Sequence, residues 1–266
     1  MHKLILFLLF ASPLLAPGQD TGFTAKLFIR YGDTLRYQVR YPDQYNKKKR
    51  YPVITFLHGS GERGSDNQAQ LLHGGGLFRR EDLRRQFPAF VIFPQCPADS
   101  AWNFFTGHPD STSIAKWMPE FHASDRPTVP ALLVKALLDS LVQARAADVD
   151  RMYIGGLSLG GFGTFDMIER YPEFFAAAMP MCGGGDTSAA ARFAKRVSVW
   201  IFHGDSDRSV DVRNSRNYYT TLKRLGADVR YTEYPGVGHN SWDNAFAEAD
   251  LLPWLFSRKR RLRGNR

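Results

Sequence analysis

The sequence predicts a single α/β domain with a mostly parallel, doubly wound sheet, helices on both of its faces and an antiparallel hairpin at one edge. Short apolar runs typical of buried strands alternate with longer runs that have helical spacing. The strand-like runs end in segments rich in glycine and polar residues. A chain of 266 residues with 44% hydrophobic residues can also bury one large core.

The elements follow one another in an order that fits this class. Residues 25–30 and 35–41 alternate apolar and polar side chains across Gly32 and Asp33, which predicts the edge hairpin. Residues 51–57 and 89–94 are almost continuously apolar, as expected of strands covered on both faces. The later predicted elements are a helix over 128–146, strand 152–155, helix 160–171, strand 175–181, short helix 187–195, strand 197–202, helix 214–225, strand 229–234 and helix 242–256.

A long connection, residues 95–127, separates the second buried strand from the first crossover helix. Loops of this length are uncommon unless they serve function or are disordered. The segment is rich in aromatic residues, which favours packing over a site rather than disorder. These aromatic residues are Trp102, Phe104, Phe105, Trp117 and Phe121.

The two ends of the chain are interpreted separately from the domain, which is assigned to residues 19–257. Residues 1–18 combine an early Lys3, an apolar run and small residues, which predicts a cleaved secretory signal peptide and a secreted or periplasmic protein. A membrane anchor is the alternative, but the run is shorter than the ~20 residues that a spanning helix needs. Residues 258–266 form a basic tail, which holds six of the positive charges behind the net charge of +9. The body is therefore nearly neutral, and we expect a solvated tail and no nucleic-acid partner.

Two cysteines, Cys96 and Cys182, remain after signal removal. An oxidising compartment would permit a disulfide. However, each cysteine follows a different predicted strand, and two further strands separate these in the proposed sheet. Since neighbouring strands lie about 4.8 Å apart, the sulfur atoms are too distant to bond, and we predict free thiols.

Ser158 is the predicted nucleophile. It lies in a G-x-S-x-G pattern, Gly156 to Gly160, between a strand-like run and a helix-like run. A nucleophile at such a strand-to-helix turn is strained, and small flanking residues avoid collisions with neighbouring elements. A hydroxyl needs a base within hydrogen-bond reach and a carboxylate that orients the base.

Asp207 and His239 supply these two groups, in the order Ser158, Asp207, His239 along the chain. Asp205 and Asp211 are the alternatives to Asp207. Asp207 lies far enough into its loop to turn back toward the histidine, while Asp205, the main alternative, lies at the strand end and is expected to cap its own turn. Backbone N–H groups of Ser60 and Leu159 are the predicted donors to an oxyanion, with Gly59 as the alternative to Ser60.

Several motifs in this order resemble those of secreted serine esterases of the α/β-hydrolase superfamily, near the dienelactone-hydrolase-like, feruloyl and acetyl-xylan esterase-like and "predicted peptidase" groups. The motifs are His58–Gly64, Pro94–Pro97 followed by Trp102, Gly156–Gly163, Cys182–Asp186, His203–Asp207 and Tyr234–Trp242. The resemblance implies an α/β-hydrolase fold and the same Ser158, Asp207 and His239. It also suggests that Glu62, Arg63 and Trp102 lie near the substrate pocket; the alternatives are a surface ion pair and a core aromatic.

The preferred function is hydrolysis of carboxylic esters through an acyl-enzyme, with a small-molecule or carbohydrate ester as substrate. No metal or organic cofactor is expected, because the sequence has no HExxH, CxxC or Walker pattern. A serine peptidase of the prolyl-oligopeptidase type is one alternative, although no segment fits a large gating domain. A non-catalytic carbohydrate- or surface-binding scaffold is the other.

Overall fold

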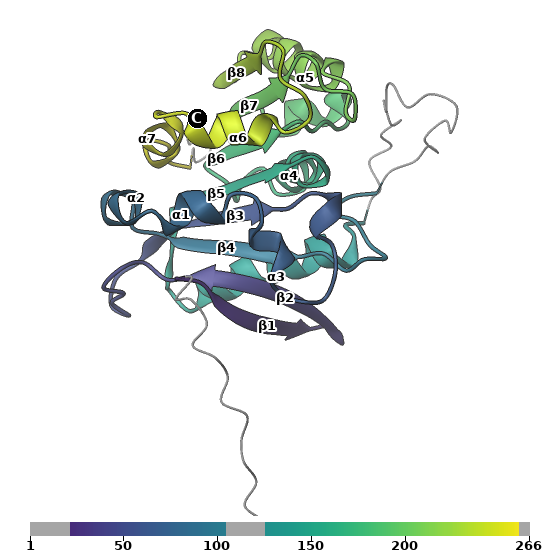
Figure 1. Cartoon of the computed structure of the whole chain (residues 1–266). Helices are drawn as coiled ribbons and strands as arrows, with labels where there is room; N and C mark the ends of the chain where they lie inside the picture. The colour runs from purple at the N-terminus through teal and green to yellow at the C-terminus, as the bar shows by residue number, and fades with distance from the viewer. Residues whose placement is uncertain (1–21, 105–125, 261–266) are drawn as a thin grey trace, which may run out of the picture.

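The computed structural model describes residues 22–104 and 126–260, which form an eight-stranded sheet between two layers of helices (Figure 1). The strands lie in the order β1-β2-β4-β3-β5-β6-β7-β8. β1 pairs with β2, and β2 with β4, in antiparallel fashion, and the other pairs are parallel. This confirms the predicted fold class. The strands are β1 (Thr24–Arg30), β2 (Asp33–Arg40), β3 (Tyr51–Leu57), β4 (Phe90–Gln95), β5 (Ala147–Leu157), β6 (Ala177–Met181), β7 (Ser198–Gly204) and β8 (Val229–Tyr234).

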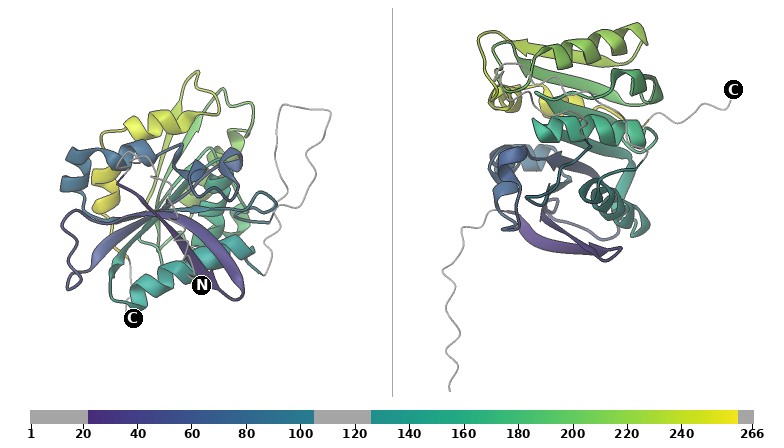
Figure 2. Two further views of the ribbon diagram at one scale, coloured as in Figure 1. Left: turned by 60° about the horizontal axis from the view of Figure 1, so that its bottom comes forward. Right: turned by 90° about the vertical axis from the view of Figure 1, so that its right-hand side faces the viewer.

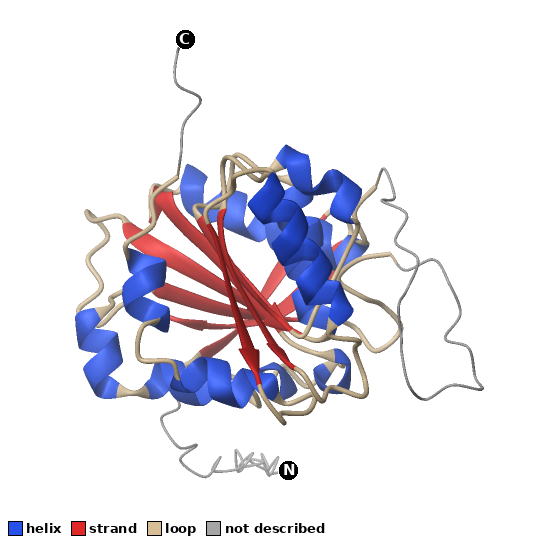
Figure 3. Ribbon diagram, turned by 90° about the horizontal axis from the view of Figure 1, so that it is seen from above, coloured by secondary structure: helices blue, strands red, loops and turns tan. Residues whose placement is uncertain are grey.

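Helices cover both faces of the sheet, and Figure 3 shows the strands as the middle layer. On one face lie α3 (Val129–Gln143), α4 (Leu159–Arg170) and α5 (Arg213–Arg224). On the other lie α1 (Gly75–Arg79), α2 (Glu81–Gln86), α6 (Ser241–Ala247) and α7 (Leu251–Phe256). The views in Figure 2 show the same layering from two other directions. Short 3-10 helices are η1 (Ser60–Glu62), η2 (Ala69–Leu71) and η3 (Thr187–Arg192).

The continuous apolar character of β3 follows from its central position. Val53 and Leu57 pack into the core on the α3–α4 face, whereas Ile54 and Phe56 pack into the second core under α6 and α7. All four side chains are at most 1% exposed. Successive residues of a strand point to opposite faces, so a strand covered on both sides has no solvent-facing position.

The predicted final helix over 242–256 is wrong in one respect, because the structure contains two helices there. α6 ends at Ala247, and α7 begins at Leu251. Pro253 lies in the first turn of α7, where its missing N–H is tolerated. A continuous helix would instead place its ring against the carbonyl of residue 249, so the chain turns between the two helices.

Cys96 and Cys182 are both free and buried, which confirms the prediction about the thiols. They follow β4 and β6, and β3 and β5 lie between these strands in the sheet.

The first part of the basic tail differs from the expected solvated terminus. Arg258 forms an ion pair with Asp228 at 3.2 Å, and Arg260 forms one with Asp150 at 3.2 Å. The backbone N–H of Arg260 also donates to the carbonyl of Asp150 at 2.8 Å. Residues 258–260 are therefore bound to the α/β domain by ion pairs and a backbone hydrogen bond.

Three predicted features lie outside the described residues: the signal peptide 1–18, most of the aromatic-rich loop (105–125) and the end of the tail (261–266). Within the described ranges, no helix combines the length and the apolar character that crossing a bilayer requires.

Candidate active site

Four loops with candidate catalytic residues meet at one edge of the sheet. They follow β3, β5, β7 and β8, which run parallel to one another, so their carboxyl ends lie on the same side. In doubly wound sheets this edge is where ligands bind. The loops contribute Ser60, Ser158, Asp207 and His239.

Ser158 lies at a strained turn between β5 and α4. Its φ of 52° and ψ of −118° place a non-glycine residue in a backbone region that is rarely occupied. The turn is packed tightly, since a Cβ atom at Gly156 would lie 2.4 Å from the carbonyl oxygen of Gly160. Only glycine allows this approach, and the turn projects Ser158 from the end of the strand.

Ser158, His239 and Asp207 form a continuous row of hydrogen bonds. Nε2 of His239 lies 3.0 Å from Oγ of Ser158, and Nδ1 of His239 lies 2.7 Å from Oδ2 of Asp207. Since the Asp207 carboxylate only accepts, Nδ1 carries a proton and Nε2 is free to accept the hydroxyl proton of Ser158. The structure thus brings together the three residues that the sequence suggested for one site.

The carboxylate of Asp207 is fully buried and accepts hydrogen bonds at both oxygens. Oδ1 accepts from the backbone N–H groups of Ser209 at 2.8 Å and Val210 at 2.9 Å. Oδ2 faces His239 and also Nε2 of His203, at 3.2 Å. Burial alone raises the pKa of a carboxyl, but hydrogen bonds from the two histidines and Val210 outweigh it and hold the pKa of Asp207 well below its usual value. Asp207 is therefore ionised at neutral pH.

His239 is the partly exposed member of the row, with 27% of its side chain accessible. Burial lowers the pKa of this imidazole, but hydrogen bonds and charge interactions with Asp207 and Cys182 together outweigh it, and the pKa is raised above its usual value. The Trp242 ring packs edge-on against the imidazole, with centroids 5.4 Å apart. The ring is thus held on two sides.

Asp205, the alternative orienting carboxylate, has a different position. Its Oδ1 accepts from the backbone N–H of Gly236 at 2.7 Å and from the hydroxyl of Ser206 at 2.9 Å. Gly236 belongs to the loop that carries His239. Asp205 therefore ties the two loops together, whereas Asp207 contacts the imidazole, which favours Asp207 as the orienting carboxylate.

The two predicted oxyanion donors each begin a helical segment. Leu159 is the first residue of α4, and Ser60 is the first residue of η1, whose N-cap is Gly59. The first N–H groups of a helix have no acceptor within it, so both are available to a ligand. Gly59 lies beside the nucleophile, since a Cβ atom there would be 3.6 Å from Cβ of Ser158.

The three tentative pocket residues have three different environments. Glu62 is 7% exposed and faces Nε2 of His73 at 3.6 Å, while Arg63 donates to the carbonyls of Ser60 and Ser100. Glu62 and Arg63 therefore do not form the surface ion pair that was the alternative. Trp102 is completely buried and donates to the carbonyl of His58 at 3.0 Å, which favours the core interpretation for this residue.

His58 and His203 each lie at the end of a strand and directly before a glycine, but their surroundings differ. His58 accepts from the backbone N–H of Cys96 at 2.9 Å, and burial lowers its pKa to about 4, so it is a neutral core residue. His203 contacts Asp207.

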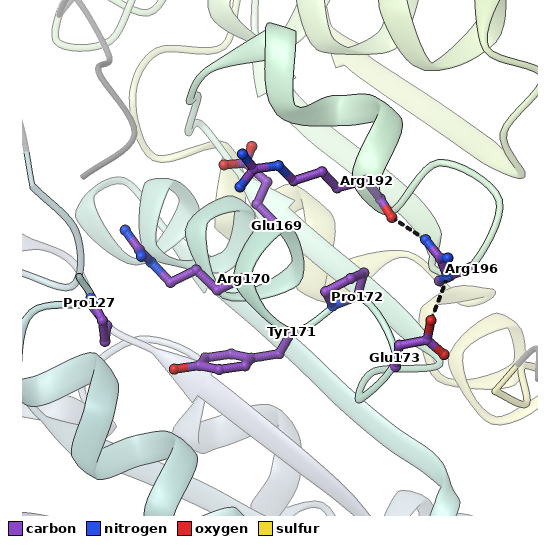
Figure 4. Close-up of a pocket in the computed structure, with 8 residues that line it drawn as sticks. All are labelled: Pro127, Glu169, Arg170, Tyr171, Pro172, Glu173, Arg192 and Arg196. Carbon is purple, nitrogen blue, oxygen red and sulfur yellow. Dashed lines mark hydrogen bonds and ion pairs between the residues drawn. The ribbon is translucent and has the colours of Figure 1, made fainter. Parts of the chain in front are cut away.

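A cavity of about 570 Å³ lies at the other end of α4 from Ser158 (Figure 4). It is lined by residues around the C-terminal end of that helix, including Glu169, Arg170 and Tyr171. Ser158 is the N-cap of α4, whose 12 residues at about 1.5 Å each separate the two ends of the helix by roughly 18 Å. The cavity is therefore separate from the hydrogen-bonded row.

Among the described residues, Cys182, Asp207 and His239 have metal-ligand atoms within 4.8 Å of one another. The 2.7 Å between Nδ1 of His239 and Oδ2 of Asp207 is a hydrogen-bond distance. An ion bound to both atoms needs two bonds of about 2.0–2.2 Å with a wide angle between them, so these side chains would have to separate first. The arrangement found here fits proton transfer.

Comparisons with known proteins agree with this geometry. Residues 44–250 match the family described as phospholipase/carboxylesterase. A thermostable esterase of known structure is 34% identical with a TM-score of 0.79, covering 90% of this chain and 64% of that one. Carboxylesterase SOBER1 of Arabidopsis thaliana is 27% identical over 234 residues, 80% of this chain and 91% of the relative. A secreted protein of Arthroderma benhamiae is 25% identical over 78% of this chain, which spans only 23% of that relative.

Proposed function

The chain belongs to the phospholipase/carboxylesterase family within the α/β-hydrolase superfamily, and we propose that it hydrolyses carboxylic esters with Ser158 as nucleophile. The observation that carries the proposal is the row of hydrogen bonds from Ser158 through His239 to Asp207. A serine hydroxyl becomes a competent nucleophile when an oriented imidazole can take its proton. Membership of the phospholipase/carboxylesterase family supports the proposal that the cleaved bond is a carboxylic ester bond.

In the proposed reaction Oγ of Ser158 attacks the ester carbonyl while Nε2 of His239 takes the hydroxyl proton. Asp207 stabilises the resulting imidazolium and keeps its Nδ1 proton in place. The tetrahedral oxyanion lies between the N–H groups of Ser60 and Leu159. Collapse breaks the bond to the alcohol, which receives its proton from His239 and leaves an acyl group on Ser158.

The second half of the reaction reverses these roles. Water enters beside the acyl group, His239 takes a proton from it, and the hydroxide attacks the carbonyl carbon. The oxyanion forms in the same place, and its collapse breaks the bond to Oγ. The carboxylic acid leaves, and the proton on His239 returns to Ser158.

The experiment compares p-nitrophenyl esters of increasing acyl length with acetylated and feruloylated oligosaccharides and with short peptides. We expect the wild-type protein to turn over esters, and Ser158→Ala to lose at least about 10⁴-fold in kcat/KM. The matched control is Ser188→Ala, an exposed serine in η3, which should keep wild-type rates. Wild-type protein without turnover of any ester contradicts the proposed function, and equal turnover by Ser158→Ala contradicts the assigned nucleophile.

We further propose that the substrate is an acylated carbohydrate or small-molecule ester met outside the cytoplasm. The apolar run of residues 1–18 supports export, and the secreted relative is consistent with it. Expression of the full chain in a bacterial host, followed by fractionation and N-terminal sequencing, tests this. Maturation near Gly18 supports export, and a retained Met1 in the cytoplasmic fraction contradicts it.

A further inference from the structure

His203 is a buried histidine with a partner at each ring nitrogen. It lies near the end of β7 and is completely inaccessible. Its Nε2 is 3.2 Å from Oδ2 of Asp207 and 3.1 Å from the carbonyl oxygen of Val210. Its Nδ1 is 2.7 Å from the hydroxyl of Ser215 on α5.

These partners define where the proton of His203 resides. Nε2 faces an ionised carboxylate and a carbonyl, and both are acceptors only, so Nε2 must carry a proton. Ser215 can donate its hydroxyl proton either to Nδ1 at 2.7 Å or to the carbonyl of Gly183 at 3.5 Å. We assign the Ser215 proton to the shorter contact, with Nδ1 as its acceptor and the imidazole neutral.

The same oxygen of Asp207 therefore serves two histidines. Oδ2 accepts from Nδ1 of His239 at 2.7 Å and from Nε2 of His203 at 3.2 Å, while the two backbone donors hold Oδ1. A carboxylate with one donor on Oδ2 could rotate about its Cβ–Cγ bond. Four donors fix the plane of the carboxylate, and this fixes the direction of the hydrogen bond from Oδ2 to Nδ1 of His239.

From this geometry we infer that His203 is a positioning residue for the reaction, which acts through Asp207 to orient His239. The inference rests on the proposed function and adds a residue to it. A neutral donor suits this place, because it orients the carboxylate without placing a second cation beside the imidazolium that forms at His239.

The other charged group that faces His203 is already paired. Glu233 on β8 lies opposite His203 in the strand register. Both of its carboxylate oxygens are taken by the guanidinium of Arg216, at 2.6 and 2.8 Å. The thiol of Cys182 is buried and its sulfur lies within 4.8 Å of a carboxylate oxygen of Asp207. Asp207 is the charged side chain that contacts His203, at 3.2 Å.

Two substitutions at position 203 distinguish the loss of the hydrogen bond to Asp207 from the loss of the imidazole ring itself. In His203→Asn the amide can occupy the place of Nδ1 and keep the contact with Ser215, but it is too short to reach Asp207. In His203→Gln the longer amide can reach Asp207. The measurements are kcat and KM on a p-nitrophenyl ester from pH 5 to 10, with the midpoint of thermal unfolding for each variant.

We expect His203→Asn to lower kcat about 10-fold with KM nearly unchanged, since a hydrogen bond to an ionised group is lost. The acid limb of its pH profile, where kcat rises as His239 loses its proton, should move to higher pH by about half a unit. The reason is that a carboxylate with one donor fewer interacts more strongly with protonated His239. His203→Gln should stay within about 3-fold of wild type with an unmoved limb. A purely structural role would change the unfolding midpoint but not the pH profile.

Trp200→Phe is the control for general damage to β7, because Trp200 lies on the same strand as His203 and the substitution removes its part-buried hydrogen bond to Thr232 on β8. It should lower the unfolding midpoint and leave kcat and the acid limb unchanged. Equal rates and limbs for His203→Asn and His203→Gln overturn the inference. If His203→Asn does not fold, Ser215→Ala is measured instead. We expect it to lose about 3-fold in kcat and to shift the acid limb of the pH profile to higher pH. Wild-type kcat and an unmoved limb in Ser215→Ala overturn the inference. Absence of wild-type turnover instead contradicts the proposed function.

Discussion

Gly160 lies directly against the carbonyl of Leu57, so close that a Cβ atom at residue 160 would be 2.0 Å from that oxygen. The turn that carries Ser158 is thereby pressed onto the end of β3. Gly160→Ala places a methyl group where backbone atoms already lie, and we expect a loss of about 2–4 kcal/mol in the free energy of unfolding together with loss of esterase activity. Urea unfolding followed by circular dichroism measures the first effect.

The matched control for this substitution is Gly76→Ala. Gly76 lies in α1, where no atom would be within 4 Å of an added Cβ, and alanine is the better helix former. It should keep full activity and unfold at the same or a higher urea concentration. If Gly160→Ala were as stable and as active as Gly76→Ala, the close packing of the turn would be contradicted.

Changing Asp207 to asparagine is expected to lower kcat far more than the same change at Asp205. Asp207→Asn places an amide against Nδ1 of His239, which favours the wrong tautomer, and kcat should fall about 10⁴-fold. Asp205→Asn keeps an acceptor for Gly236 and removes only a charge, so kcat should stay within about 3-fold. Steady-state kinetics on one ester decide this. A larger loss for Asp205→Asn would make Asp205 the orienting carboxylate.

The rate should rise with pH through the ionisation of His239. Only the neutral imidazole can accept the proton of Ser158, and Asp207 together with Cys182 raises the pKa of His239, so the inflection of kcat/KM should lie above the ordinary value of about 6.5. In Asp207→Asn the contribution of Asp207 is gone while burial remains, and the inflection should move to lower pH than in the wild type. A pH profile of kcat/KM for the two proteins tests this, and an inflection that does not move would contradict it.

Glu169 makes stability depend on pH far from the reacting groups. It is buried, and this burial raises its pKa to about 8, although a hydrogen bond from the hydroxyl of Tyr218 lowers it. In the unfolded chain its pKa is about 4.3, so the unfolded state loses its proton first. Stability should therefore fall as pH rises from about 4 to 8 and level off above that.

Glu169→Gln keeps an acceptor for Tyr218 and has no proton to lose. Its gain in unfolding free energy over wild type should be small at pH 4 and grow up to pH 8–9, as measured by urea unfolding at several pH values. The control is Glu173→Gln, since that carboxylate is 54% exposed and pairs with Arg196, and its effect should be small and nearly constant. A gain for Glu169→Gln that is the same at every pH would contradict the raised pKa.

The sequence predicted most of the elements because their signals are local. The bounds of β3 and β8 agree to the residue with the predicted 51–57 and 229–234, since both runs are bounded by turns. The division of the last helix was missed because the apolar spacing continues across the break. Pro253 was the local sign of it.

For the site, the order of Ser158, Asp207 and His239 was enough to suggest that they meet, because parallel strands place their carboxyl ends on one side. The second histidine at Asp207 could not be derived in this way. Whether His203 points at Asp207 depends on the turn between them and on Ser215 of α5, which holds the ring from the other side. Such tertiary contacts leave no periodic signal.

The most direct test of the central claim is covalent labelling of the purified protein with a fluorophosphonate, followed by intact mass and peptide mapping. The activated hydroxyl should take one label per chain on Ser158, and Ser158→Ala should take none while it still unfolds cooperatively. His239→Ala should label far more slowly, since the base is missing. A label on another residue, or esterase turnover in wild-type protein that no label blocks, would contradict the assignment of Ser158 as the nucleophile.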